Sequence, residues 1–250
     1  MTAGRPARML GWLITGAGLA AGATLWEIVG RSMGAAFVAP LSDTLEALNP
    51  AIFRALLSSL GLFAAGFTLS VAVGVPLGLL LARIRLLRVA LESYIAILNA
   101  TPMAALIPFI LSMMGFDFAP KALVVFLFAV FPILYNTVEG ARSIRPELIE
   151  VARSFRSSER ALWRDVLLPF VLPFALTGIR QAIGRALVGM VAAEFFLSAS
   201  GIGMTLQSAA QSFDTATIFA AILLVTLLGV FLMEVGGSIE RRYAAWRNIQ

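Results

Sequence analysis

The chain has 250 residues, of which 60% are hydrophobic and 13% charged, and its formal net charge is +5. Soluble domains average about 45–50% apolar and about 25% charged residues, so this composition excludes a soluble globular domain and indicates a chain solvated by a bilayer. The absence of cysteine and histidine excludes disulfides, thiol nucleophiles and imidazole metal ligands. No G-x-x-x-x-G-K-[ST] motif occurs, so any ATP energy has to come from a partner.

Long apolar runs predict membrane-spanning helices, because about 20 helical residues cross the hydrocarbon core of a bilayer. Six such runs lie near residues 9–29, 57–82, 91–114, 120–141, 172–198 and 215–238. Prolines inside these runs predict kinks rather than loops, because neighbouring helices satisfy the freed carbonyls. They are Pro76, Pro102, Pro108 and Pro132.

The first run has a second interpretation as a signal peptide. Arg5 and Arg8 precede it, and Ala21-Gly22-Ala23 resembles a small-residue cleavage site. The apolar part of a signal peptide is about 7–15 residues long, whereas this stretch extends from Met9 to Trp26. An uncleaved first span is therefore favoured.

The basic residues predict the orientation of the spans. Fourteen of the 19 lie on one side of the six-span arrangement, namely Arg5, Arg8, Arg83, Arg85, Arg88, Arg142, Arg145, Arg153, Arg156, Arg160, Arg164, Arg241, Arg242 and Arg247. Arg31, Arg54 and Lys121 lie on the other side, and Arg180 and Arg185 fall within the fifth span. The positive-inside rule thus predicts cytoplasmic N- and C-termini. Nucleic acid is not an expected partner, because no aromatic platform separates the dispersed arginines.

The connection from about residue 142 to 171 is charged and patterned. Pro146 suits the first turn of a helix, and apolar residues then recur at helical spacing, which predicts an amphipathic helix of about nine residues. The apolar positions are Leu148, Val151, Ala152 and Phe155. A serine of Ser157-Ser158 can cap a second short helix, which we expect to end at Pro169. The two helices either lie in the membrane interface or dock in a groove of a cytoplasmic partner.

This connection resembles the EAA loop of permease subunits of bacterial binding-protein-dependent ABC importers. The family pattern is E-A-A, three residues, G, nine residues and I-x-L-P, and it is matched by Glu150-Val151-Ala152 and Val166-Leu167-Leu168-Pro169. Val151 replaces the central alanine, and Arg156 occupies the place of the glycine. If the turn there is left-handed, a residue other than glycine costs roughly 1–2 kcal/mol.

Further motifs extend the resemblance over about residues 38–247. They are Gly74-Val75-Pro76-Leu77-Gly78, Asn99-Ala100-Thr101-Pro102, Phe131-Pro132-Ile133-Leu134-Tyr135-Asn136-Thr137, Ala193-Glu194 and Gly201-Ile202-Gly203. The set is most similar to the nitrate, taurine and aliphatic-sulfonate branch. The resemblance implies an all-α membrane bundle of six transmembrane helices, the type I importer fold. Residues 1–37 would form the N-terminal tail and first transmembrane helix, and residues 38–247 a permease core of five more, with the cytoplasmic coupling loop at 142–171.

The implied function is that of a transmembrane subunit of an ATP-driven importer in the bacterial inner membrane. Such a subunit passes a small, here anionic, solute from a periplasmic or lipid-anchored substrate-binding protein to the cytoplasm by alternating access. The resemblance implies a second permease copy, most simply in a homodimer, two ATP-binding cassette subunits that hold ATP and Mg, and surrounding lipid. Within this chain we expect no catalytic residue, metal or cofactor. The alternative is an ion-coupled secondary carrier with Glu194 as proton site and Arg185 as substrate site.

The resemblance also assigns site residues. The helix from about Leu148 to Ser157 is expected to insert in a groove of the ATP-binding subunit, although Glu150 has the simpler alternative of an ion pair with Arg153. The expected coupling residues are Glu150, Val151, Ala152, Arg153, Ser154, Arg156 and Pro169.

Polar residues within the spans predict the translocation path or its gate, together with the proline and the methionine that adjoin two of them in the third span. The candidates are Asn99, Thr101, Pro102, Met103, Arg185 and Glu194. In helical projection one face carries Arg180, Gly184, Leu187, Val191 and Glu194. That face is expected to line the path or the dimer interface, unless Glu194 makes a structural hydrogen bond to a neighbouring span. Likewise, the segment 99–103 either lines a cavity or packs against protein.

A short helix is expected on the outer face after the fifth span. Gly201, Gly203, Gln207 and Gln211 are the candidates there for contact with a binding protein or for an outer gate, and a solvated surface helix is the alternative. Asp214 is suited to cap the last span.

Overall fold

The computed structural model describes residues 5–34, 37–196 and 200–244, and no strand occurs among these residues. They form α1 (Arg5–Met33), α2 (Leu41–Glu46), α3 (Pro50–Arg83), α4 (Arg85–Ala100), α5 (Met103–Met114), α6 (Phe118–Arg142), α7 (Pro146–Ser154), α8 (Glu159–Leu162), the π-helical segment η1 (Trp163–Leu167), α9 (Leu168–Phe195), α10 (Ile202–Gln211) and α11 (Thr215–Ala244).

The six predicted spans correspond to five long helical segments and one bent pair. The long segments are Leu13–Met33, Pro50–Arg83, Phe118–Arg142, Glu159–Phe195 and Thr215–Arg242, each long and apolar enough to cross a membrane. The sixth span is the pair formed by α4 and α5, which meet at an angle of 96°. An all-α membrane bundle is therefore confirmed, with five candidate spans, or six if the bent pair forms one broken span. Part of the predicted end of the fifth span, residues 197–199, lies outside the described residues.

The break between α4 and α5 corrects the expectation that Pro102 only kinks its span. Thr101 has an extended backbone with φ −68° and ψ 132°, the region favoured by a residue before proline. Its hydroxyl and its N–H both donate to the carbonyl of Ile97, at 2.8 and 3.0 Å. These are the last helical bonds of α4, because Pro102 has no N–H to donate the next one. Pro76, Pro108 and Pro132 lie inside helices, as predicted.

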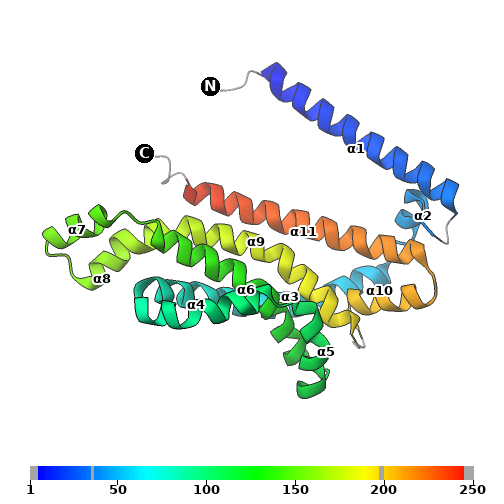
Figure 1. Cartoon of the computed structure of the whole chain (residues 1–250). Helices are drawn as coiled ribbons and strands as arrows, with labels where there is room; N and C mark the ends of the chain where they lie inside the picture. Colours follow the sequence, from blue (N-terminus) through cyan, green and yellow to red (C-terminus); the bar gives the residue numbers. More distant parts are fainter. Residues whose placement is uncertain (1–4, 35–36, 197–199, 245–250) are drawn as a thin grey trace.

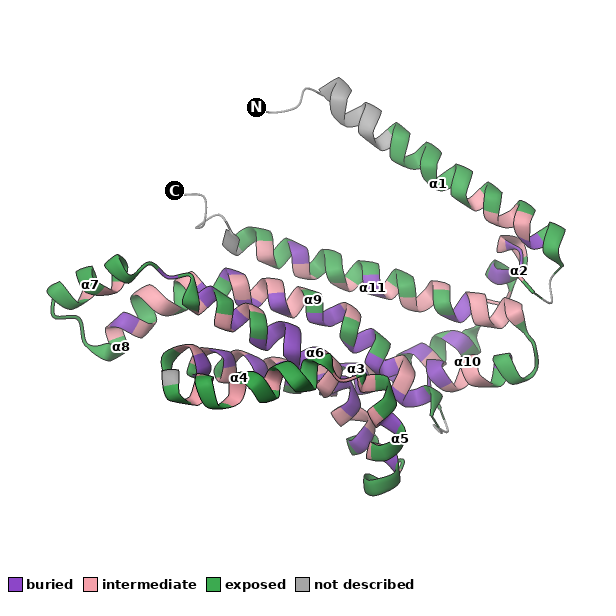
Figure 2. Ribbon diagram, viewed as in Figure 1, coloured by how far each residue is buried: buried purple, intermediate pink, exposed green. Residues whose placement is uncertain are grey.

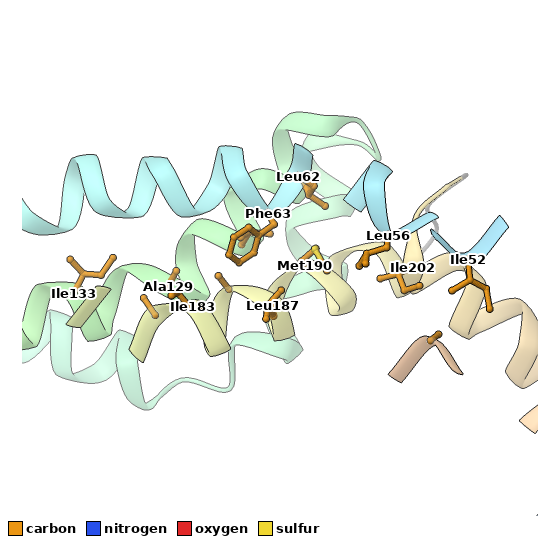
Figure 3. Close-up of a cluster of buried hydrophobic side chains, with 14 of the residues drawn as sticks. Ile52, Leu56, Leu62, Phe63, Ala129, Ile133, Ile183, Leu187, Met190 and Ile202 are labelled. Atoms are coloured by element: carbon orange, nitrogen blue, oxygen red, sulfur yellow. The ribbon is translucent and has the colours of Figure 1, made fainter. Parts of the chain in front are cut away.

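The core lies where α3, α6 and α9 pack together (Figure 1). Small residues on α3 allow close approach: a Cβ at Gly78 would lie 2.7 Å from Cβ of Thr137, and one at Gly74 would lie 3.0 Å from Cγ2 of Ile133. The Gly74-x-x-x-Gly78 step therefore packs α3 against α6 within one chain. Figure 2 shows the buried residues concentrated along these helices. Figure 3 shows Phe63 of α3 among the apolar side chains of α6 and α9.

The first helix contacts the remaining chain mainly near its C-terminal end. Trp26 Nε1 donates to the carbonyl of Ala39 at 3.0 Å, and its ring lies 5.7 Å from that of Phe219 between centroids. The carboxylate of Glu27 accepts hydrogen bonds from the N–H and the hydroxyl of Ser42, both at 3.0 Å. Toward its N-terminus α1 diverges from α11, and residues 13–22 are exposed (Figures 1 and 2).

Candidate functional site

The two ends of the bundle differ in charge, because arginines gather at one of them. At the arginine-rich end, α3 finishes with Arg83, α6 with Arg142 and α11 with Arg241 and Arg242, and the segment α7–α8 projects from it. The opposite end holds α2 and α10 (Figure 1). The candidate site residues fall into three groups, one at each end and one between them.

At the arginine-rich end, α7 begins at Pro146 and has nine residues, as predicted. It has no buried residue, and its apolar face is exposed: Val151 is 54% exposed and Phe155 82% exposed. Ile149 and Arg153 instead line a cavity of about 140 Å³ against α3, α6 and η1. One side of α7 therefore faces the bundle, and an apolar face is left unpartnered among the described residues.

The residues expected to couple to an ATPase are mostly on the surface of this segment. Glu150, Val151, Arg153, Ser154 and Arg156 are exposed, and Ala152 is half-buried. Within the described part of the chain Glu150 and Arg153 make no ion pair, so the simpler alternative for Glu150 is not realised here.

Arg156 forms the turn after α7 in a left-handed conformation, with φ +55°. Its N–H donates to the carbonyl of Arg153 at 2.8 Å, and the N–H of Ser157 donates to the carbonyl of Ala152 at 3.1 Å. This pair of bonds is the Schellman arrangement that ends helices, in which glycine is the usual left-handed residue. The turn at this position is therefore left-handed, and Arg156 carries its cost.

The second short helix begins as predicted but does not end at Pro169. The hydroxyl of Ser158 accepts from the N–H of Ala161 at 3.2 Å, and Glu159 forms an ion pair with Arg83 of α3. The chain then continues through η1 into α9, with Leu168 N–H donating to the carbonyl of Trp163. Pro169 lies in the first turn of α9, where a missing N–H is tolerated. The predicted stop is therefore wrong, and α8, η1 and α9 form one helical path from Glu159 to Phe195.

Between the two ends, a cavity of about 340 Å³ gathers four of the residues predicted for the translocation path. The break between α4 and α5 supplies Asn99, Thr101 and Met103, and α9 supplies Arg185. Nη1 of Arg185 donates to Oδ1 of Asn99 at 3.5 Å. Pro102 is not part of the lining, although it causes the break that opens the wall. The remaining lining residues are Leu127, Phe128, Phe131, Gly184 and Val188.

Arg185 gives this cavity its chemistry. The side chain makes no ion pair with any described residue, and its one long hydrogen bond goes to a neutral amide. A guanidinium has five N–H donors and binds carboxylates, sulfonates or phosphates through pairs of them. Arg185 is exposed in the single chain, so the cavity presents a positive charge that has no carboxylate partner among the described residues, beside the polar groups of Asn99 and Thr101. This arrangement is suited to an anion.

Glu194 does not line this cavity but lies in a buried network near the opposite end. Its carboxylate is 3% exposed and accepts from the Ser59 hydroxyl at 2.7 Å and from the Gly203 N–H at 3.0 Å. The Ser59 oxygen in turn accepts from the N–H of Ile202 at 2.8 Å. One carboxylate thus joins α3, α9 and α10. Of the two interpretations given above, the structural hydrogen bond to a neighbouring span is the one observed.

Two glycines fit around this carboxylate, which corrects their expected place on an outer contact surface. Gly201 has φ +103°, and a Cβ there would lie 2.4 Å from Cδ of Glu194. A Cβ at Gly203 would lie 2.5 Å from Cβ of Glu194. Both glycines are buried, whereas Gln207 is half-buried and Gln211 is exposed on α10. The glycines therefore close the turn around Glu194, and only the glutamines remain as surface candidates.

The residues predicted to share one face of α9 have different surroundings: α11, the Arg185 cavity, and α3 with α10. Arg180 forms an ion pair of 3.2 Å with Glu240 of α11, which also accepts from the hydroxyl of Thr177 at 2.6 Å. Gly184 lines the Arg185 cavity, and Glu194 bonds α3 and α10. The expectation of one continuous path-lining face is therefore wrong, because the helices packed against α9 change along its length.

The last helix begins with the predicted cap. Asp214 accepts from the N–H of Thr217 at 3.1 Å and from its hydroxyl at 2.6 Å. These hydrogen bonds, the hydroxyl foremost, hold the pKa of the Asp214 carboxyl below its usual range. The residue before it, Phe213, is left-handed with φ +57° and 81% exposed.

Ser59 is the site residue that sequence reasoning missed. Its position in an apolar span is a weak signal, because a buried serine more often bonds the carbonyl one turn earlier, as Ser59 also does with Ala55. Nothing in the pattern indicates a partner 135 residues away.

Comparison with known proteins identifies the family. The family model described as a binding-protein-dependent transport system inner membrane component matches residues 74–244. A probable ABC transporter permease of Brucella melitensis is 31% identical over 199 residues, which cover 80% of this chain and 81% of that protein. A putative aliphatic sulfonates transport permease of Bacillus subtilis is 31% identical over 231 residues, 90% of this chain and 84% of that one.

A nitrate import permease of Leptolyngbya laminosa is 32% identical over 193 residues, 76% of this chain and 68% of that protein. Among solved structures, the MetNI methionine ABC transporter in an inward facing conformation matches with a TM-score of 0.65 and 20% identity over 77% of this chain and 96% of that one. This likeness shows the fold, and the relatives do not favour a self-sufficient carrier. The chain belongs to the family of inner membrane components of binding-protein-dependent transport systems, the permease subunits of ABC importers.

Proposed function

We propose that this permease moves a small anionic solute of the sulfonate, taurine or nitrate type into the cytoplasm by alternating access. It sits in a bacterial inner membrane with both termini cytoplasmic, so the arginine-rich end faces the cytoplasm. Two copies form the pathway. Two ATP-binding cassette subunits that hold ATP and Mg drive it, and a periplasmic or lipid-anchored binding protein delivers the solute. The chain itself performs no covalent chemistry.

The observation that supports an anionic solute is the position of Arg185 in its cavity. Relatives are named for aliphatic sulfonates and nitrate, which are anions, but others are named for formylaminopyrimidine and riboflavin. Family membership alone does not choose among these solutes. An arginine without a carboxylate partner favours a negatively charged solute, because a neutral one would leave the charge unpaired each time it fills the cavity. Asn99 and Thr101 add neutral polar groups at the same wall.

The coupling role rests on the exposed apolar face of α7. Leu148, Val151 and Phe155 share this face, and an amphipathic helix with such a face typically lies in a groove of its partner. The helical path α8–η1–α9 then connects the docked segment to the span that carries Arg185. Closure of the ATP-binding subunits would move the two coupling segments together and change which end of the pathway is open.

The substrate part is tested with Arg185→Gln in proteoliposomes that contain the ATP-binding subunits and a sulfonate- or nitrate-loaded binding protein. A hydrogen bond to a charged group contributes about 1.5–3 kcal/mol, so we expect anion uptake to fall by about tenfold or more. Arg185→Lys should restore part of the uptake. Arg54→Gln, which removes an exposed arginine at the start of α3, is the matched control. Uptake that is equal in all three variants would overturn the assignment.

The coupling part is tested with Glu150→Arg. We expect this reversal to abolish transport and stimulated ATP hydrolysis while the permease stays folded and inserted. Glu147→Arg makes the same charge change on the same exposed helix, but outside the segment that is assigned to docking, and should retain most activity. Undiminished ATP-dependent transport by Glu150→Arg would exclude the docking role.

A further inference from the structure

A groove of about 490 Å³ lies between α3 and the start of α9, at the arginine-rich end. Val75 and Leu79 of α3 form one wall, and Leu168, Leu172 and Pro173 of α9 form much of the other. Arg164 is the charged residue in the lining. The volume lies within the range of about 300–1,000 Å³ that is typical of ligand pockets.

The groove opens at the surface of two candidate spanning helices. Its walls belong to two candidate spans, Pro50–Arg83 and Glu159–Phe195, near the ends that carry Arg83 and Glu159. Leu168 and Leu172 are 44% and 41% exposed, so part of each side chain is uncovered in the single chain. With the orientation proposed above, this depth corresponds to the acyl chains just below the headgroups of the cytoplasmic leaflet. A water-soluble ligand would find few polar partners in such a wall.

Arg164 places donors at the rim of the groove. Its Nε and Nη2 donate to the two carboxylate oxygens of Asp165, at 2.7 and 3.1 Å. These bonds engage two of its five N–H groups and pair its charge with a carboxylate, so three donors remain while the Arg164–Asp165 pair carries no net charge. Arg160, one turn earlier, is exposed and makes no ion pair among the described residues. An apolar trough with arginine donors at its cytoplasmic rim is complementary to an amphiphile with one negative end.

We propose that this groove binds an anionic phospholipid of the cytoplasmic leaflet. One acyl chain lies along Leu79, Leu168 and Leu172, and the phosphate accepts from Arg164, with Arg160 close enough in sequence to contribute a second charge. The assignment of the leaflet rests on the orientation given under the proposed function, whereas the binding itself does not.

The site adjoins the coupling segment. Leu79 and Val171 line both the lipid groove and the cavity beneath α7, so the two spaces meet at these side chains. A chain held in the groove fixes α3 against η1, which is the connection between α7 and the span that carries Arg185. Anionic lipid is thus placed to modulate how motion of α7 reaches the pathway.

The test is lipid retention by the intact transporter complex, measured by native mass spectrometry after release from nanodiscs that contain phosphatidylglycerol and phosphatidylcholine. Arg164→Gln removes the rim donors, and Leu172→Trp fills the trough. The matched controls are Arg242→Gln, at the same end but on α11, and Leu227→Trp, which changes an exposed leucine of α11 outside the groove. We expect each groove variant to retain about tenfold less phosphatidylglycerol than its control, with phosphatidylcholine unchanged by Arg164→Gln.

Retention that is equal in the groove variants and their controls, or that does not distinguish the two lipids, would overturn the proposal. Cross-linking through Leu172→Cys supplies the second measurement. A photoreactive phospholipid should be captured there, whereas capture of a second permease copy at that position would assign the groove to a protein interface instead. Neither measurement depends on transport. Failure of the lipid proposal is therefore distinguishable from failure of the anion assignment, which is tested by uptake.

Discussion

Ser59→Ala tests how strongly the buried network around Glu194 stabilises the fold. The substitution removes the hydroxyl that donates to the Glu194 carboxylate at 2.7 Å and that accepts from Ile202 N–H at 2.8 Å. A hydrogen bond to a charged group contributes about 1.5–3 kcal/mol, and a buried donor left without a partner costs about 1–3 kcal/mol. We therefore expect the free energy of unfolding to fall by about 3–5 kcal/mol.

Ser70→Ala is the matched control, because Ser70 lies on the same helix and is equally buried. Its hydroxyl donates to the carbonyls of Gly66 and Phe126, at 2.7 and 3.1 Å. Both carbonyls lie inside helices and keep a backbone donor, so this substitution leaves no polar group unpaired. Its expected cost is about 0.5–1.5 kcal/mol. The difference between the two serines isolates the contribution of the charged network.

Denaturant unfolding of the purified permease in mild detergent gives the two free energies, and hydrogen–deuterium exchange gives their location. In Ser59→Ala, the amides of Ile202 and Gly203 should lose protection, because α10 is released from α3 and α9. In Ser70→Ala, they should keep it. Equal losses of stability in the two variants, or unchanged protection of Ile202 in Ser59→Ala, would refute the reasoning.

Three further predictions concern turns and caps. Gly203→Ala should cost about 1–3 kcal/mol of stability, because the added Cβ would lie 2.5 Å from Cβ of Glu194. Gly61→Ala, where the added Cβ has no neighbour within 4 Å, should cost nothing. Thermal unfolding of the two variants measures the difference. Arg156→Gly should slow amide exchange in α7, because it removes roughly 1–2 kcal/mol of left-handed strain. The lowered pKa of Asp214 adds stability above the ordinary aspartate pKa and loses it as the pH falls through the folded-state value. Asp214→Asn keeps a capping oxygen and should remove that part of the acid dependence of the melting temperature.

The helix starts could be predicted because their signals are local. Pro146 at the start of α7, Ser158 before α8 and Asp214 before α11 each act within one helical turn, and each lies where the sequence indicates. The apolar runs located the spans in the same way, although α3 begins at Pro50, before the predicted run, and the predicted run 91–114 is divided into α4 and α5. These are properties of neighbouring residues, so a single sequence contains them.

The effects of individual prolines could not be predicted in this way. Pro102 ends a helix with a bend of 96°, whereas Pro108 and Pro132 lie inside helices and Pro169 lies within a continuous helical path. What differs is the backbone before each proline: Thr101 is extended before Pro102, and a π-helical turn precedes Pro169. Helical spacing alone does not contain such bonding choices.

The composition of the candidate site was predictable, but its division was not. Asn99, Thr101 and Arg185 share a cavity with Met103, as expected from the rule that polar residues inside apolar spans mark a functional site. Glu194 met the same criterion and lies in a different network with Ser59. The partners of a residue on α9 depend on which helix crosses it at that level, and this is a property of the packed bundle.

The two left-handed residues other than glycine relate strain to the proposed contacts. Among the described residues only Arg156 and Phe213 have positive φ without being glycine, and both are exposed at the ends of short helices, α7 and α10. Phe213 repeats the Schellman bonds of Arg156: Asp214 N–H donates to Ala209 at 2.9 Å and Phe213 N–H to Ala210 at 3.3 Å. Glycine would form either turn without strain. Arg156 follows α7, the helix proposed to dock on an ATP-binding subunit, whereas Phe213 follows α10 at the opposite end of the bundle. Under that proposal, contact with the ATP-binding subunit would offset the strain at Arg156.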